Sequence, residues 1–169
     1  AARTAPQVDQ SFVLYFMKAN GLLLAGQPAD AIDAYFTASQ DSNLFARAAN
    51  NRGVATQELL LANGTASADS NGETVTVDDV FAHLETAHLN TSDAGQQAVI
   101  LTNIGLANLY FDRDRDTALA RCTDALNFNP DYLLTQACLV GRAVAQAEET
   151  ECPVGDEPLA ALTQSLEVT

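Results

Sequence analysis

The sequence predicts an all-α fold built from four consecutive hairpins of antiparallel helices. The first observation behind this prediction is composition: the 169-residue chain is 47% hydrophobic and has only 9 glycines and 5 prolines. That balance favours helices over disorder. The length suits one domain with its own core. No apolar run approaches the roughly 20 residues of a membrane span, so we expect no integral membrane segment.

The second observation is a stripe of apolar or small residues that recurs in four segments. Each stripe has two members seven positions apart and a third between them, so all three lie on one helix face. Such a face is expected to pack against a partner helix. The four stripes are Ala31, Tyr35 and Ala38; Val80, Leu84 and Ala87; Ala118, Cys122 and Ala125; and Pro158, Leu162 and Ser165.

The third observation is a small residue in the middle of the helical segment that precedes each stripe. Glycine inside a helix costs about 1 kcal/mol relative to alanine, so its recurrence needs a packing reason. We expect the partner helix to cross closely at each of these points. The four small residues are Ala19, Gly53, Gly105 and Gly141.

These patterns together predict eight helices. They are expected at 8–25, 28–40, 44–62, 76–90, 94–111, 115–128, 131–149 and 156–167. Between the third and fourth helices, residues 63–73 form a polar insertion rich in Asn, Gly, Ser and Thr. That composition predicts a flexible surface loop.

The hairpin pattern resembles the tetratricopeptide repeat. The best match runs from Asn103–Ala107 through Ala118 and Ala125 to Phe128 and Pro130. A second match runs from Tyr15 through Gly26 to the stripe that ends at Ala38. The resemblance implies a right-handed α-solenoid, with an N-terminal segment at 1–11 and one repeat domain at 12–167. The repeats would span about 12–45, 46–92, 97–131 and 133–167.

In that family, the first helices of successive repeats line a concave groove that holds a peptide or a partner segment. The resemblance therefore implies a non-catalytic binding or scaffold protein with a protein partner. Amide side chains in the groove would grip a peptide backbone, and an arginine would hold a carboxylate. The groove positions implied are Phe16, Asn20, Asn50, Val54, Thr102, Leu106, Cys138 and Arg142.

Two other modes of binding are compatible with the same helices. One is a small-molecule or envelope-component binding protein, with its pocket between the groove and the insertion at 63–73. The other is self-association through the end repeats, which predicts a homo-oligomer. Stabilisation of the chain by a small ligand would favour the pocket.

No residue set predicts catalysis, a cofactor or a metal. His83 and His88 are five residues apart, whereas a shared metal needs ligands three or four apart on one helix face, so we expect solvated or rim histidines. The acidic segment 112–116 resembles the start of a calcium loop. Its sixth and twelfth places hold Thr117 and Thr123 instead of the required glycine and glutamate. We therefore expect no enzyme activity.

The net charge of −14, from 22 acids and 8 bases, repels nucleic-acid backbones and anionic lipids. We interpret the acidic excess as a source of solubility, with recruitment of a basic partner as the alternative.

The cysteines and the N-terminal residues bear on the compartment. The start of the chain, Ala1–Pro6, is similar to what remains when a signal peptide is removed. This favours a soluble, exported, periplasmic protein, in which a disulfide between Cys138 and Cys152 or between Cys122 and Cys138 would form. Three buried thiols in the cytoplasm fit the sequence equally well, because connectivity does not follow from sequence.

Overall fold

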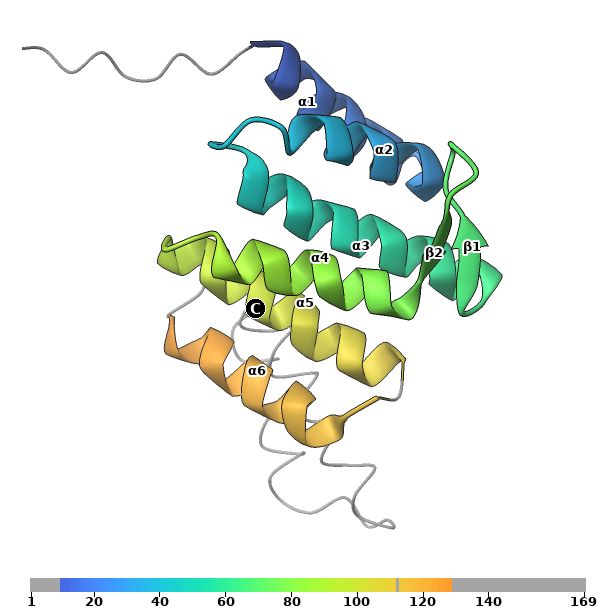
Figure 1. Cartoon of the computed structure of the whole chain (residues 1–169). Coiled ribbons are helices and arrows are strands. Elements are labelled where there is room, and N and C mark those ends of the chain that lie inside the picture. Colours follow the sequence, from blue (N-terminus) through green and yellow to red (C-terminus); the bar gives the residue numbers. More distant parts are fainter. Residues whose placement is uncertain (1–9, 112, 129–169) are drawn as a thin grey trace, which may run out of the picture. The chain divides into compact units, whose positions relative to one another are not determined.

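The computed structural model of the chain describes residues 10–111 and 113–128. These residues form six helices and one two-stranded sheet (Figure 1). All six helices predicted for this part of the chain are confirmed, with ends that differ by two residues at most. The elements are α1 (Gln10–Leu24), α2 (Pro28–Ala38), α3 (Phe45–Asn63), β1 (Ala66–Ala68), β2 (Thr74–Thr76), α4 (Val77–Leu89), α5 (Ala94–Tyr110) and α6 (Arg115–Asn127).

The chain divides into two compact units, Ala1–Asn90 and Thr91–Thr169. In the described part of the first unit, α1 packs on α2, α2 on α3, and α3 on α4. In the second unit α5 packs on α6. Helices that follow each other in the sequence thus pack together. The helices expected at 131–149 and 156–167 lie outside the described residues, and the single repeat domain at 12–167 stays a prediction.

Glycines mark the close helix contacts, as the sequence predicts. A Cβ atom built on Gly53 of α3 would lie 2.8 Å from Cγ of Leu84 on α4. One built on Gly105 of α5 would lie 2.9 Å from Sγ of Cys122 on α6. Real Cβ atoms do not approach this closely, so only glycine lets each pair of helices come together at this separation.

The predicted stripes form the core of the helix pairs. All nine residues of the first three stripes are buried, and Ala19 of α1 is buried as well. Tyr35 is the largest fully buried side chain among the described residues. In the second unit Leu101, Cys122 and Ala125 form one buried cluster, against which Leu126 packs. The helical spacing alone thus identifies the faces that leave water.

Local signals define the helix ends. Gly26 adopts a positive φ of 71° in the turn between α1 and α2, which a glycine tolerates without strain. Pro28 is the first residue of α2, where its missing N–H costs nothing. Asp114 precedes α6 and accepts a hydrogen bond from the backbone N–H of Thr117 at 3.0 Å.

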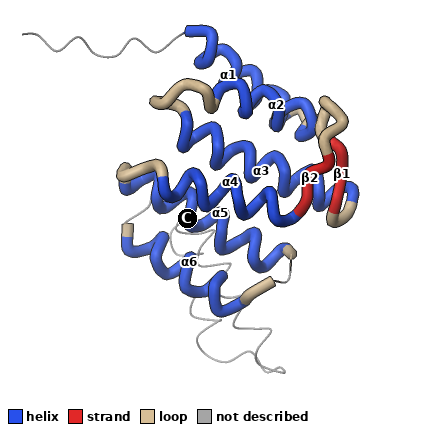
Figure 2. Tube along the Cα trace, viewed as in Figure 1, coloured by secondary structure: helices blue, strands red, loops and turns tan. Residues whose placement is uncertain are grey.

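The insertion at 63–73 is not the flexible loop that its composition predicts, and the all-α assignment is corrected by a small β-hairpin (Figure 2). β1 and β2 are antiparallel, with Ser67 opposite Val75. Val75 is buried, and both strands contact α3. The sequence signal is weak because each strand has only three residues. Burial of Val75 against the helices supplies the stability that so short a hairpin lacks.

Asp69 holds the turn of this hairpin. Its buried carboxylate accepts hydrogen bonds from the backbone N–H groups of Asn71 at 3.0 Å and Glu73 at 2.8 Å. Gly72 has a positive φ of 82° in the same turn. An acidic side chain that bonds the backbone two residues on, followed by glycine, is a turn signal of the Asx type. The turn is therefore encoded locally, although the strands are not.

No helix in the part of the chain that the structure describes is long and apolar enough to cross a membrane.

Candidate functional site

A row of polar side chains joins α1, α2 and α3 in the first unit. Oδ1 of Asn20 accepts a hydrogen bond from the Tyr35 hydroxyl at 2.7 Å and another from Nδ2 of Asn51 at 3.2 Å. Oδ1 of Asn51 in turn accepts from Nδ2 of Asn50 at 3.0 Å. We call these four side chains the amide row. It brings together residues that lie up to 31 positions apart in the sequence.

The row orients the amide of Asn20. Because its oxygen accepts from two donors, its NH2 group faces the other way, and no described residue accepts from it. The ring of Phe16 meets that of Tyr35 edge-on, with centroids 5.8 Å apart. Burial raises the pKa of Tyr35, against the opposing hydrogen bond to Asn51, so its hydroxyl remains a donor at neutral pH.

The predicted groove residues of the first unit differ in their accessibility. Phe16, Asn20 and Val54 are half-buried, so each presents some surface. Asn50 is only 6% exposed. Its neighbour Asn51 is half-buried and reaches Asn20 instead. Asn51 is not among the predicted groove residues, because the predicted groove face of α3 contains Asn50, one residue earlier.

The remaining predicted groove residues belong to the second unit. Thr102 is 1% exposed, and its hydroxyl donates to the carbonyl of Ala98 at 2.9 Å. Such a buried hydroxyl satisfies its own helix and offers nothing to a ligand. Leu106 is half-buried. Cys138 and Arg142 lie outside the described residues.

Of the three cysteines, the structure describes Cys122 alone. It is buried in the contact between α5 and α6, beside Gly105. Both disulfide pairings predicted from the sequence involve Cys138, and one involves Cys152; both residues lie outside the described part of the chain. The pairings stay predictions.

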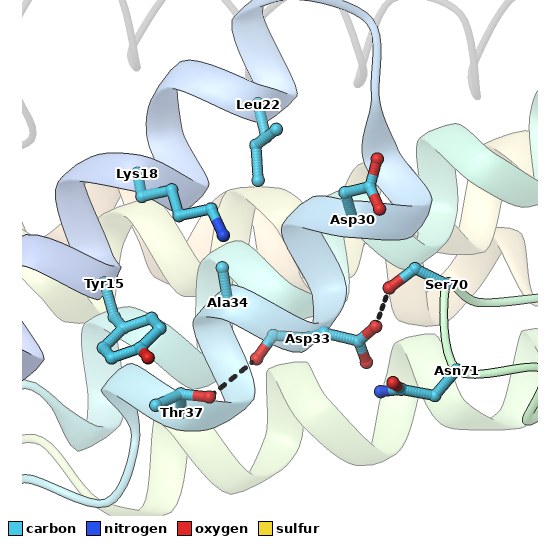
Figure 3. Close-up of a pocket in the computed structure, with 9 residues that line it drawn as sticks. All are labelled: Tyr15, Lys18, Leu22, Asp30, Asp33, Ala34, Thr37, Ser70 and Asn71. Atoms are coloured by element: carbon cyan, nitrogen blue, oxygen red, sulfur yellow. Dashed lines mark hydrogen bonds between the residues drawn. The ribbon is translucent and has the colours of Figure 1, made fainter.

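A hollow of about 410 Å³ lies between α1, α2 and the turn of the hairpin (Figure 3). The small-molecule alternative expects a pocket between the groove and the insertion at 63–73, and that site stays a prediction. This hollow borders residues 70 and 71 of the insertion. Its other walls are the α1 face that carries Lys18 and the α2 face that carries Asp33. The lining residues are Tyr15, Lys18, Leu22, Asp30, Asp33, Ala34, Thr37, Ser70 and Asn71.

The hollow contains charges of both signs. Lys18 is the only lysine in the chain, and Asp30 and Asp33 line the same space. The Ser70 hydroxyl donates a hydrogen bond to the carboxylate of Asp33, which ties the hairpin turn to α2. Comparison of the chain with family models, curated proteins and solved structures finds no match.

Arg52 of α3 lies among acidic residues of α2, the hairpin and α4. Its guanidinium stands 4.9 Å from the ring centroid of Phe36, a cation–π distance. Burial lowers the pKa of Arg52, and the nearby carboxylates of Asp33 and Asp69 act in the opposite direction. Its Nε is buried and has no hydrogen-bond partner among the described residues. Arg52 is thus a half-buried cation whose charge is opposed by the acids of the hairpin and by Asp33 of α2.

His83 of α4 is half-buried, which fits the rim position, and not the solvated one, of the two that the sequence predicts. Burial lowers its pKa to about 4, with help from the positive charge of Arg52 and against the pull of Asp79. The imidazole is therefore neutral at pH 7. The other histidine of the chain, His88, is half-buried on the same helix.

This shift predicts a pH dependence of stability. Between its ordinary pKa of 6.5 and its folded value of about 4, His83 is protonated in the unfolded chain but not in the folded one. The neutral, buried His83 therefore costs no stability above pH 6.5. As the pH falls from 6.5 towards 4, the unfolded chain binds a proton at His83 that the folded chain does not, so the free energy of unfolding falls. We expect the unfolding free energy of His83→Gln to fall less across this window than that of the wild type, by up to about 2 kcal/mol after allowing for the partial exposure of the ring.

The measurement is urea unfolding at pH 7, 6, 5 and 4. His88→Gln, on the same helix, is the matched control and should follow the wild type. Identical slopes for the wild type and His83→Gln would show that His83 does not sense the buried environment described above.

Proposed function

We propose that the chain is a non-catalytic binding protein that holds an extended segment of a protein or peptide partner across the amide row. The observation that carries this proposal is the orientation of Asn20, whose oxygen is occupied by Tyr35 and Asn51. Its NH2 group is then a fixed donor for a peptide carbonyl. A donor that is already held in place loses little entropy when it binds.

The surroundings of the row support a peptide ligand. Phe16 on α1 and Val54 on α3 are half-buried apolar groups that would contact side chains of a bound segment. Arg47 and Glu58, both exposed on α3, offer one charge of each sign. An apolar floor with a few placed polar groups is the usual composition of a recognition surface.

The tetratricopeptide resemblance supports the same proposal. A right-handed solenoid of four hairpins would align the first helices of successive hairpins along one surface. The resemblance also implies Leu106 and Arg142 as groove positions, and an arginine is suited to a carboxylate of the partner.

The test is selection of peptides from a random library on the whole chain, followed by measurement of the affinity of enriched peptides for Asn20→Asp. This change keeps an oxygen for Tyr35 and Asn51 but replaces the donating NH2 group by an acceptor. We expect a loss of affinity of about tenfold or more, since a hydrogen bond is lost and a repulsion is added. The urea unfolding midpoint should be almost unchanged, because Asn20 is only half-buried.

Asn43→Asp is the matched control, because it makes the same change of charge at an exposed position of the first unit. It should bind the peptides as the wild type does. Failure of the selection to enrich any peptide, or equal affinity for Asn20→Asp and the wild type, would overturn the assignment of the row as a peptide site.

A further inference from the structure

The hollow between α1, α2 and the hairpin turn has opposite charges on its walls that do not neutralise each other. Among residues 10–111 and 113–128, neither Lys18 nor Asp30 forms an ion pair. Figure 3 shows the ammonium group of Lys18 on the α1 side, with Asp30 and Asp33 on α2. Charges left apart across a space of about 410 Å³ are available to a ligand in that space.

We propose that this hollow binds a small zwitterion of the α-amino-acid type. The carboxylate of the ligand pairs with the Lys18 ammonium, and its ammonium group pairs with Asp30 and Asp33. The volume falls within the range of about 300–1,000 Å³ that is usual for small-molecule sites. A zwitterion satisfies both signs of charge at once, which is the electrostatic complementarity that selects one ligand class over another.

The uncharged walls fit the rest of such a ligand. Tyr15, Leu22 and Ala34 offer aromatic and aliphatic surface for a side chain. Ser70 holds the carboxylate of Asp33 from the side of the hairpin, so this acid is already oriented before a ligand arrives. Asn71 adds an amide at the same edge. The hairpin thereby contributes a polar wall to a site whose charges come from the helices.

Ligands with a single charge fit less well. A simple anion would meet Lys18 but also two carboxylates, in a chain whose net charge is −14. A simple amine would pair with the carboxylates but face the Lys18 ammonium. Each of these ligands leaves one like-charge contact uncompensated, which lowers affinity.

The inference is independent of the proposed peptide site. Lys18 and Asn20 are two residues apart on α1. This is a rotation of about 200° around the helix axis, so the two side chains lie on nearly opposite faces of the helix. The two sites therefore use different faces of α1, and each can fail without the other.

The experiment is a titration of the whole ¹⁵N-labelled chain, followed by NMR, with L-leucine as the probe. Two matched compounds each lack one charge: N-acetyl-L-leucine has no ammonium group, and L-leucinamide has no carboxylate. We expect saturable shifts of the Ser70 and Asn71 amide signals with L-leucine. Each matched compound should bind about tenfold more weakly or worse, since it loses one charge-assisted contact.

Variants then assign the charges. Lys18→Met and Asp30→Asn should each weaken L-leucine binding by about tenfold or more. Arg113→Met and Asp124→Asn make the same changes of charge at exposed positions that do not line the hollow, and they should bind as the wild type does. All four positions are exposed, and the NMR spectrum of each variant reports its folding directly.

The proposal is overturned if L-leucine, glycine and L-tyrosine all fail to shift these signals at millimolar concentration. It is also overturned if Lys18→Met binds L-leucine as tightly as the wild type, or if L-leucinamide binds equally well. Peptide binding at the amide row would be unaffected by any of these results.

Discussion

Replacement of Gly53 by valine is expected to destabilise the first unit by about 2–3 kcal/mol, the upper range for overpacking of a close-packed core. The new Cβ would lie 2.8 Å from Cγ of Leu84 and 3.3 Å from the backbone oxygen of Val80. The oxygen belongs to the α4 backbone, so relief requires the two helices to separate. Separation would expose Leu84, which is fully buried against α3.

The measurement is urea unfolding by circular dichroism, with hydrogen exchange of the α3 and α4 amides to locate the effect. Gly21→Val is the matched control, because a Cβ on Gly21 of α1 has no atom within 4 Å. It should change stability by only a few tenths of a kcal/mol, given the similar helix propensities of glycine and valine. If the two variants are equally stable, the contact at Gly53 does not set the helix separation.

A double variant sharpens this prediction. Leu84→Ala removes the side chain that the new methyl groups would meet, at its own cost of about 2–5 kcal/mol for an emptied core position. The combination with Gly53→Val should cost less than the two changes added together, because the valine fills the space that the alanine leaves.

The second large effect is expected for Asp69→Ala, which should destabilise the hairpin by about 2–3 kcal/mol. The change removes the acceptor for the backbone N–H groups of Asn71 and Glu73. It leaves these donors without a partner in a turn where the carboxylate was buried. Loss of two charge-assisted hydrogen bonds to a buried carboxylate carries this cost. Arg52 also loses one of the carboxylates that oppose the effect of its burial.

Hydrogen exchange of the amides from Ala66 to Thr76 measures this effect. Asp69→Asn is the matched variant, since it retains Oδ1 as an acceptor, and it should lose less than half as much stability. Asp124→Ala, an exposed acid on α6, should leave exchange in the hairpin unchanged. Equal exchange in Asp69→Ala and the wild type would mean that the strands, not the aspartate, maintain the turn.

The helical architecture was predictable because its signals are local and repeated. Stripes such as Ala31, Tyr35 and Ala38 show which face of a helix is buried. Because their spacing matches the helical period, they also predict where the helix lies in the sequence. Gly53 and Gly105 were informative for a different reason. Glycine is costly inside a helix, so its presence there implied a close contact before any contact was seen.

The hairpin was missed because its strands are too short for an alternating pattern to stand out. The turn residues Asp69 and Gly72 were visible in the sequence, but they fit a loop as well as a hairpin. What decides between the two is the burial of Val75 and the packing of the strands on α3 and α4, the helices on either side of the insertion. That contact is tertiary, and no short-range pattern in the sequence predicts it.

The candidate sites divide in the same way. Asn20 was selected from the sequence, whereas its partner Asn51 was not, because one residue of helix phase turns a side chain by about 100°. The hollow is lined by residues between positions 15 and 71, which come from α1, α2 and the hairpin turn. No spacing rule brings Lys18, Asp30 and Ser70 to one place. The low pKa of His83 likewise comes from its burial and, after that, from Arg52, which is 31 positions away.

For residues 10–111 and 113–128, the sequence by itself determined that helices pair in order, where those helices begin and end to within two residues, and which small residues let them approach. These features follow from periodicity and propensity, which act over a few residues. Only the tertiary structure decided that the insertion pairs as a hairpin, that Asn51 completes the amide row, and that Lys18 and Asp30 share a hollow. Each of these depends on the distance between side chains far apart in the sequence, and that distance is set by the packing of whole helices.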